Sequence, residues 1–250
     1  MENFKNMIRI SVIALLLSSC SNSITSNGGG LSYSTSFTGC PDAEIEWVNM
    51  LMINDIKYKH HFSHPDENFP VTIEKGRELG KVNYKMAGSA CSNHKEQNGD
   101  ATYLEEGTSI YEIKGYPTSL VVVANDVVYV ADRNKKAKTV GELYPMDKLV
   151  KNIHIQSTED GKRLHTFSPS SKDKFLAEFY KLELEDVQSL IDAGKLDGTR
   201  IFLEIELNNG VLIRQLYWSD TNTFHSGAIG NDEIEEVILD EVSNLENEYQ

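Results

Sequence analysis

Short apolar runs separated by turn residues dominate the chain from about residue 40 to residue 153, and this pattern predicts mostly β-strands. We expect strands at 44–53, 56–62, 80–86, 108–113, 119–124 and 127–131. The clearest pair flanks Asn125-Asp126, two residues that tolerate positive φ and suit a tight hairpin. Because residues 120–123 and 127–130 are apolar on both faces, we expect this hairpin at the centre of a sheet.

Hairpins and helices replace this pattern from about residue 154 onward. Asp160-Gly161 predicts one hairpin turn, and Asn209-Gly210 predicts a second turn of two residues. Folding the chain about the second turn pairs Leu207 with Leu212, Ile205 with Arg214, Leu203 with Leu216 and Ile201 with Trp218. All these positions except Arg214 are apolar, so this register gives the sheet one apolar face.

Two helices are predicted in the same region. Phe175, Leu176, Phe179 and Leu182 have helical spacing, and Ser171 is the expected N-cap. Asp232–Glu248 carries eight acidic and no basic residues, and its apolar stripe consists of Ile234, Val237, Ile238, Val242 and Leu245. The sequence therefore predicts an α+β protein, with a β-rich module over 40–153 followed by a smaller α+β module over 154–250 that contains antiparallel hairpins and a C-terminal amphipathic helix.

The first twenty residues have the organisation of an export signal. Lys5 and Arg9 precede an apolar run over 10–17, and small residues lead to Cys20. The run is too short for a transmembrane helix, so residues 1–19 are predicted to be a cleaved signal peptide. An ordinary secretion signal with a cysteine at its end by chance is the alternative.

Leu17-Ser18-Ser19-Cys20 resembles the lipobox of bacterial lipoproteins. The resemblance implies that Cys20 becomes the new N-terminus and carries a diacylglyceryl thioether. Two acyl chains give stable membrane attachment where a single chain is marginal, since each buried methylene contributes about 0.8 kcal/mol. The expected localisation is the extracytoplasmic side of the cell membrane, with the membrane as partner through this anchor.

Residues 20–39 are predicted to be a flexible tether, because residues 21–39 are rich in Ser, Thr and Gly and contain no charged residue. A coil of this length reaches about 25 Å. The whole chain has a formal charge of −14, and removal of residues 1–19, whose net charge is +1, leaves −15. This acidity argues against binding of nucleic acid and predicts repulsion from anionic lipid headgroups.

Cys40 and Cys91 remain once Cys20 is lipidated, and an exported pair can form a disulfide. A loop of this length stabilises a fold by about 4 kcal/mol in the chain-entropy model. Two unpaired thiols are the alternative. We leave both open here.

Candidate metal and catalytic residues are few. His60 and His64 can reach one ion if their segment turns, but residues 57–62 look like a strand, so solvated histidines are the preferred interpretation and no metal or other cofactor is expected. The sequence contains no GxSxG, P-loop or dinucleotide motif, and acidic residues are too abundant to single out a catalytic pair. The catalytic residues therefore stay unassigned.

Two groups of basic residues are candidates for binding. Arg133, Lys135, Lys136 and Lys138 form a cluster that either faces lipid phosphates or acidic polymers or is a solvated loop after the central hairpin, and we prefer the loop. Arg214 either packs its aliphatic part and extends its charged group to the edge or to the acidic terminal helix, or binds an anion inside a cleft.

The segment over 104–116, with Gly107-Thr108 at a turn and Lys114-Gly115-Tyr116 at its end, resembles a recurring segment of uncharacterised exported lipoproteins of bacilli. The resemblance implies export and a β-rich module, and it implies no activity. We therefore expect a lipid-anchored, non-enzymatic surface protein that binds or modulates a partner. The alternatives are an exported hydrolase of cell-wall polymer or peptide with a dispersed acid–base site, and a structural or inhibitory spacer.

Overall fold

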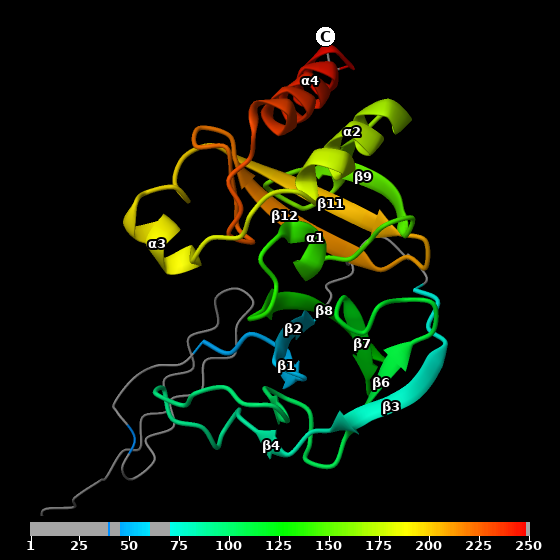
Figure 1. The fold of residues 1–250 in the computed structure, drawn as a ribbon, viewed down its shortest axis with the longest axis vertical. Coiled ribbons are helices and arrows are strands. Elements are labelled where there is room, and N and C mark those ends of the chain that lie inside the picture. Colours follow the sequence, from blue (N-terminus) through cyan, green and yellow to red (C-terminus); the bar gives the residue numbers. More distant parts are fainter. Residues whose placement is uncertain (1–39, 41–45, 61–70, 249–250) are drawn as a thin grey trace, which may run out of the picture. The chain divides into compact units, whose positions relative to one another are not determined.

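The computed structural model describes residues 40, 46–60 and 71–248, with side chains described as far as Leu245. The predicted signal peptide, Cys20, the tether and His64 lie outside the described residues. The described part is an α+β fold rich in antiparallel strands (Figure 1). None of the helices in this part is long and apolar enough to cross a membrane.

Eight strands of the described chain form the first sheet, in the order β3-β6-β7-β8-β2-β1-β5-β4. Their bounds are β1 Met50–Ile53, β2 Ile56–His60, β3 Lys75–Lys81, β4 Tyr84–Lys85, β5 Asp100–Ala101, β6 Ser109–Ile113, β7 Val121–Ala124 and β8 Val127–Asn134. Only the pair of β4 and β5 is parallel among the described pairs. β7 and β8 lie in the interior of the sheet, which confirms the expected central hairpin.

The turn of this hairpin has the predicted conformation. Asn125 and Asp126 have φ values of 50° and 62°, the left-handed geometry that short polar side chains tolerate. The predicted strand over 80–86 is wrong in its bounds, because the chain pairs earlier, in β3, and again briefly in β4. Glycines at 76 and 80 had hidden β3 from the apolar pattern.

Five strands of the described chain form the second sheet, in the order β10-β9-β11-β12-β13. They are β9 Val150–Gln156, β10 Arg163–Thr166, β11 Arg200–Leu207, β12 Leu212–Trp218 and β13 Thr223–Phe224. β9 and β10 form the hairpin predicted at Asp160-Gly161. β9 crosses the boundary that we predicted between residues 153 and 154, and the described residues all belong to one compact unit.

The predicted register of the β11–β12 hairpin is wrong by one residue. Ile205 pairs with Ile213, and Glu204 pairs with Arg214. The turn contains three residues, because the N–H of Leu207 donates to the carbonyl oxygen of Val211 and Gly210 adopts a φ of 83°. This is a turn with a bulge at the left-handed glycine, which adds one residue to the expected turn and reverses the face of every β12 side chain.

Four helices are described: α1 Val140–Leu143, α2 Pro169–Phe179, α3 Val187–Asp192 and α4 Asp232–Glu248. α2 and α4 lie side by side against the second sheet (Figure 1). α4 has the predicted bounds, and its predicted apolar stripe packs into the core. The N-cap of α2 is Ser168 rather than Ser171, because Pro169 suits the first helical position and leaves the residue before it as the cap.

Candidate functional site

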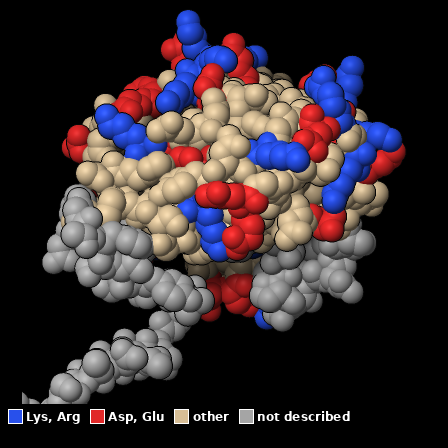
Figure 2. All heavy atoms as spheres, turned by 90° about the horizontal axis from the view of Figure 1, so that it is seen from below, with Lys and Arg blue, Asp and Glu red and all other residues tan. Residues whose placement is uncertain are grey.

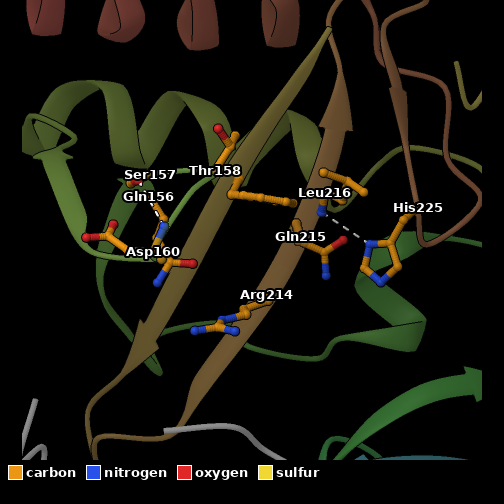
Figure 3. A pocket seen from close by; sticks show the side chains of 10 residues that line it. Gln156, Ser157, Thr158, Asp160, Arg214, Gln215, Leu216 and His225 are labelled. Atoms are coloured by element: carbon orange, nitrogen blue, oxygen red, sulfur yellow. Dashed lines mark hydrogen bonds between the residues drawn. The ribbon is translucent and has the colours of Figure 1, made fainter. Parts of the chain in front are cut away.

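A cavity of about 390 Å³ adjoins the second sheet, and we call it the Arg214 pocket (Figure 3). Its lining residues come from β9, β11 and β12, from the turn after β9 and from the end of β13; they are Gln156, Ser157, Thr158, Asp160, Gly161, Phe202, Arg214, Gln215, Leu216 and His225. The pocket therefore unites four segments that are far apart in the sequence.

The strand register explains which side chains meet on the pocket side of the sheet. Phe202 of β11 pairs with Gln156 of β9 and with Leu216 of β12. His225 continues this row, because it exchanges backbone and side-chain hydrogen bonds with Leu216. Paired residues of antiparallel strands share a face. The apolar side chains of Phe202 and Leu216 therefore lie between the amide of Gln156 and the imidazole of His225.

The opposite face of the second sheet packs against the helices. Tyr217 lies next to Leu216 in β12 and its ring contacts Phe224, which in turn contacts Phe179 of α2. Side chains alternate between faces along a strand, so Phe202, Leu216 and Arg214 point away from these helices. The pocket thus lies on the side of the sheet that α2 and α4 leave uncovered.

Arg214 is the cation of the pocket and its side chain is exposed. Its cross-strand neighbour Glu204 is only 1% exposed and is already bound elsewhere: Arg163 Nε lies 2.6 Å from one carboxylate oxygen, and Gln156 Nε2 donates to the other over 2.6 Å. No described residue forms an ion pair or hydrogen bond with the guanidinium of Arg214. Its planar set of N–H donors is therefore open to an anion.

A second buried carboxylate, Glu206, lies on the same face two residues further along β11. It accepts hydrogen bonds from Lys151 Nζ over 2.8 Å and Asn152 Nδ2 over 3.0 Å, and His154 Nε2 is 3.2 Å away. Burial alone would raise the pKa of Glu206, but these hydrogen bonds outweigh it and lower the pKa to about 2. Glu206 is therefore ionised at neutral pH.

His154 and His225 are both neutral at pH 7. Burial lowers the pKa of His225 to about 4, and burial also lowers the pKa of His154 despite its contact with Glu206. The Nδ1 atom of His225 accepts a hydrogen bond from the N–H of Leu216 over 3.3 Å. The hydrogen of this imidazole is consequently on Nε2, which makes His225 a neutral donor at the pocket.

None of the four residues of the predicted basic cluster is among the residues that line the Arg214 pocket. Arg133 lies in β8 and Lys136 forms an ion pair with Asp55 over 3.2 Å, while the backbone N–H of Lys138 donates to Glu142. Lys135 is exposed. On the face seen in Figure 2, described Lys and Arg side chains lie among Asp and Glu side chains.

The other candidate residues lie elsewhere. His60 ends β2 and its ring contacts Tyr129 edge-on at 5.9 Å between centroids. Within the described chain, no three His, Cys, Asp or Glu side chains gather as a metal centre. A disulfide joins Cys40 and Cys91, whose Cα atoms are 5.3 Å apart.

Sequence reasoning identified Arg214 but missed its surroundings. Gln156, Phe202 and His225 become neighbours only through the register of β9, β11, β12 and β13. The sequence does contain a pattern that predicts a polar face on this strand, because Glu204 and Glu206 alternate with apolar residues.

Comparisons with family models, with curated proteins and with solved structures found no match to this chain. The site is therefore interpreted from its own geometry.

Proposed function

We propose that this protein is an extracytoplasmic lipoprotein, attached to the membrane through Cys20, that binds a small organic anion in the Arg214 pocket. The attachment is supported by the export signal and by the lipobox-like residues before Cys20. Binding is supported by one observation above all: a guanidinium without a partner among the described residues lines a cavity that has an apolar centre.

The chemistry of the pocket favours a carboxylate on an apolar body. The guanidinium of Arg214 presents paired N–H donors that match the two oxygens of a carboxylate. Phe202 and Leu216 offer apolar surface beside it, and the Nε2–H of His225 offers a neutral donor. A cavity of about 390 Å³ has the size of small-molecule pockets, which range over roughly 300–1,000 Å³.

The net charge makes this recognition local. A chain with a formal charge of −14 does not attract anions over long distances. Affinity for the anion must then come from direct hydrogen bonds and apolar contacts within the pocket. We therefore expect a weak dependence of the dissociation constant on ionic strength compared with proteins that use basic surfaces.

An exported hydrolase that uses a pair of carboxylates requires one of them to donate a proton. Glu204 and Glu206 are the paired carboxylates of this sheet, and both are engaged by cationic or amide groups. With a pKa of about 2, Glu206 holds no proton to donate at neutral pH. This observation favours binding over acid–base hydrolysis at the second sheet.

Binding is tested by NMR titration of the full chain with aliphatic and aromatic monocarboxylates, with the corresponding primary amides as uncharged probes. We expect the carboxylates to shift resonances of Phe202 and Leu216 and the amides to bind far more weakly. Arg214→Gln should weaken carboxylate binding at least about tenfold, since a hydrogen bond to a charged group contributes about 1.5–3 kcal/mol.

Arg200→Gln is the matched control, because Arg200 is an exposed arginine of β11 that does not line the pocket. It should bind carboxylates like the wild type. Equal affinity of Arg214→Gln and Arg200→Gln, or equal affinity for acids and amides, would overturn the proposed ligand class.

A further inference from the structure

We propose that Met50, Met86 and His94 bind a monovalent soft metal ion, Cu(I), at the edge of the first sheet. The proposed site is independent of the Arg214 pocket. It is built by β1, β5 and β4, which are neighbours in the sheet, and by the segment that follows β4.

The strand register places the methionines on one face. Leu51 of β1 and Lys85 of β4 both pair with Ala101 of β5. One residue further along, Met50 and Met86 flank Thr102: the N–H of Thr102 donates to the Met50 carbonyl over 2.9 Å, and the N–H of Ala87 donates to Thr102 over 3.0 Å. Met50 and Met86 therefore occupy one row across the sheet.

This row lies on the face opposite to the main core. Leu51 and Ala101 belong to the main core cluster. Met50, Met52, Met86 and Ala90 instead form a separate buried cluster, with Trp47 and Tyr84 packed against it. Three thioethers are thus gathered outside the main core, and two of them, those of Met50 and Met86, line a cavity together with His94.

His94 is oriented by a buried carboxylate. Its Nε2 atom lies 2.7 Å from Asp100 Oδ2, and Asp100 is only 5% exposed. The ring also packs on Tyr84, at 5.3 Å between centroids. An imidazole that donates its Nε2–H to this carboxylate can offer Nδ1 to a metal ion, and Nδ1 of His94 has no partner among the described hydrogen bonds.

A cavity of about 230 Å³ connects these groups. Met50, Met86, His94, Trp47, Cys91 and Thr102 are among its lining residues. The two methionines are 2% and 3% exposed, so both side chains are largely shielded from bulk solvent. Methionines that serve packing alone need no imidazole held by a carboxylate beside them, and this combination distinguishes the site from ordinary core.

The donor set selects the ion. Thioethers are soft, uncharged ligands that favour Cu(I), and imidazole also binds copper, whereas Ca²⁺ and Mg²⁺ need several oxygen ligands. A histidine that gives its other N–H to a carboxylate has the arrangement common to metal-binding histidines. A single positive charge also loses less solvation than a divalent ion beside the apolar side chains of Met50, Met86 and Trp47. Lys57, Glu46 and Glu96 line the cavity as well, and Lys57 forms an ion pair with Glu96.

Cu(I) binding is measured on the full chain by competition with a chromophoric Cu(I) chelator, with ascorbate as reductant. Ag(I) serves as a redox-inert probe of the same charge. A thiol assay before and after each titration must show that the Cys40–Cys91 disulfide is intact, since free thiolates would bind both ions. We expect one bound ion per chain and quenching of Trp47 fluorescence.

Met50→Leu and Met86→Leu conserve volume while removing the sulfur, and each should weaken binding at least about tenfold, as should His94→Gln. Met146→Leu is the matched control, because Met146 is fully buried in the main core, and it should bind like the wild type. Equal affinity of Met50→Leu, Met86→Leu and Met146→Leu would overturn the proposal.

X-ray absorption of the wild-type complex gives a second test that does not depend on the folding of any variant. We expect sulfur neighbours together with a nitrogen neighbour around the ion. A shell of oxygen and nitrogen atoms only, or no bound ion in either titration, would refute the proposed site.

Discussion

His225 links the protonation of one side chain to the stability of the second sheet. Burial lowers its pKa to about 4 in the folded chain, against 6.5 for an ordinary histidine. Between these two pKa values the unfolded chain binds more protons than the folded chain does. The contribution of neutral His225 to the free energy of unfolding is therefore complete above pH 6.5 and is lost as the pH falls through about 4. The full effect of this residue is about 3 kcal/mol.

We predict that the free energy of unfolding, measured by urea denaturation, falls steadily from pH 7 to pH 4. His225→Asn keeps an acceptor for the N–H of Leu216 but cannot titrate, so its free energy of unfolding should fall less over this range. Part of the decrease in the free energy of unfolding with falling pH should remain in this variant, since burial lowers the pKa of His154 too. If the free energies of unfolding of the wild type and of His225→Asn fall in parallel with pH, His225 does not control the pH dependence of stability.

At the scale of elements, Gly210 determines how the β11–β12 hairpin is aligned. Its φ of 83° lies in the left-handed region, where a side chain costs about 1–2 kcal/mol. We predict that Gly210→Ala lowers the free energy of unfolding by about 1 kcal/mol, whereas Gly210→Asn loses less, because Asn tolerates this conformation. Urea denaturation of the three proteins at pH 7 measures the difference.

Asn209→Asp is the control for this hairpin, since Asn209 does not adopt a positive φ and Asp keeps an acceptor for the N–H of Val211. It should change stability less than Gly210→Ala does. A larger loss at Asn209 than at Gly210 would mean that the turn type assigned here is wrong.

The β11–β12 hairpin also shows which structural features the sequence predicts and which it does not. Local signals predicted the Asn125-Asp126 turn and all of α4, because turn residues and a helical stripe act over a few positions. The register of β11 and β12 depended on one bulge residue. Each register gives one of the two buried residues an apolar partner: Leu216 for Leu203 in the predicted register, and Ile213 for Ile205 in the observed one. Residue types alone could therefore not separate them, and the register decides which side chains surround Arg214.

At the scale of the whole molecule, the proposed attachment through Cys20 and the acidity of the chain would have opposite effects at a membrane. The acyl chains predicted on Cys20 contribute apolar attachment, while a mature charge of −15 favours distance from anionic headgroups. The uncharged residues over 21–39 are the expected means of separation. Membrane association should therefore resist high salt and require detergent for release.

We predict that Cys20→Ser abolishes labelling by an alkyne-tagged fatty acid and moves the chain from the membrane fraction to the medium, or leaves the precursor uncleaved. Cys91→Ser is the matched control, because it removes a cysteine without touching the proposed anchor, and it should keep both the label and the membrane fraction. The measurement is immunoblotting of fractions from a bacterial host after washes with high salt and with detergent. Unchanged fractionation of Cys20→Ser would end the anchor hypothesis, whereas release of the wild type by salt alone would show that charge, rather than acyl chains, holds the protein.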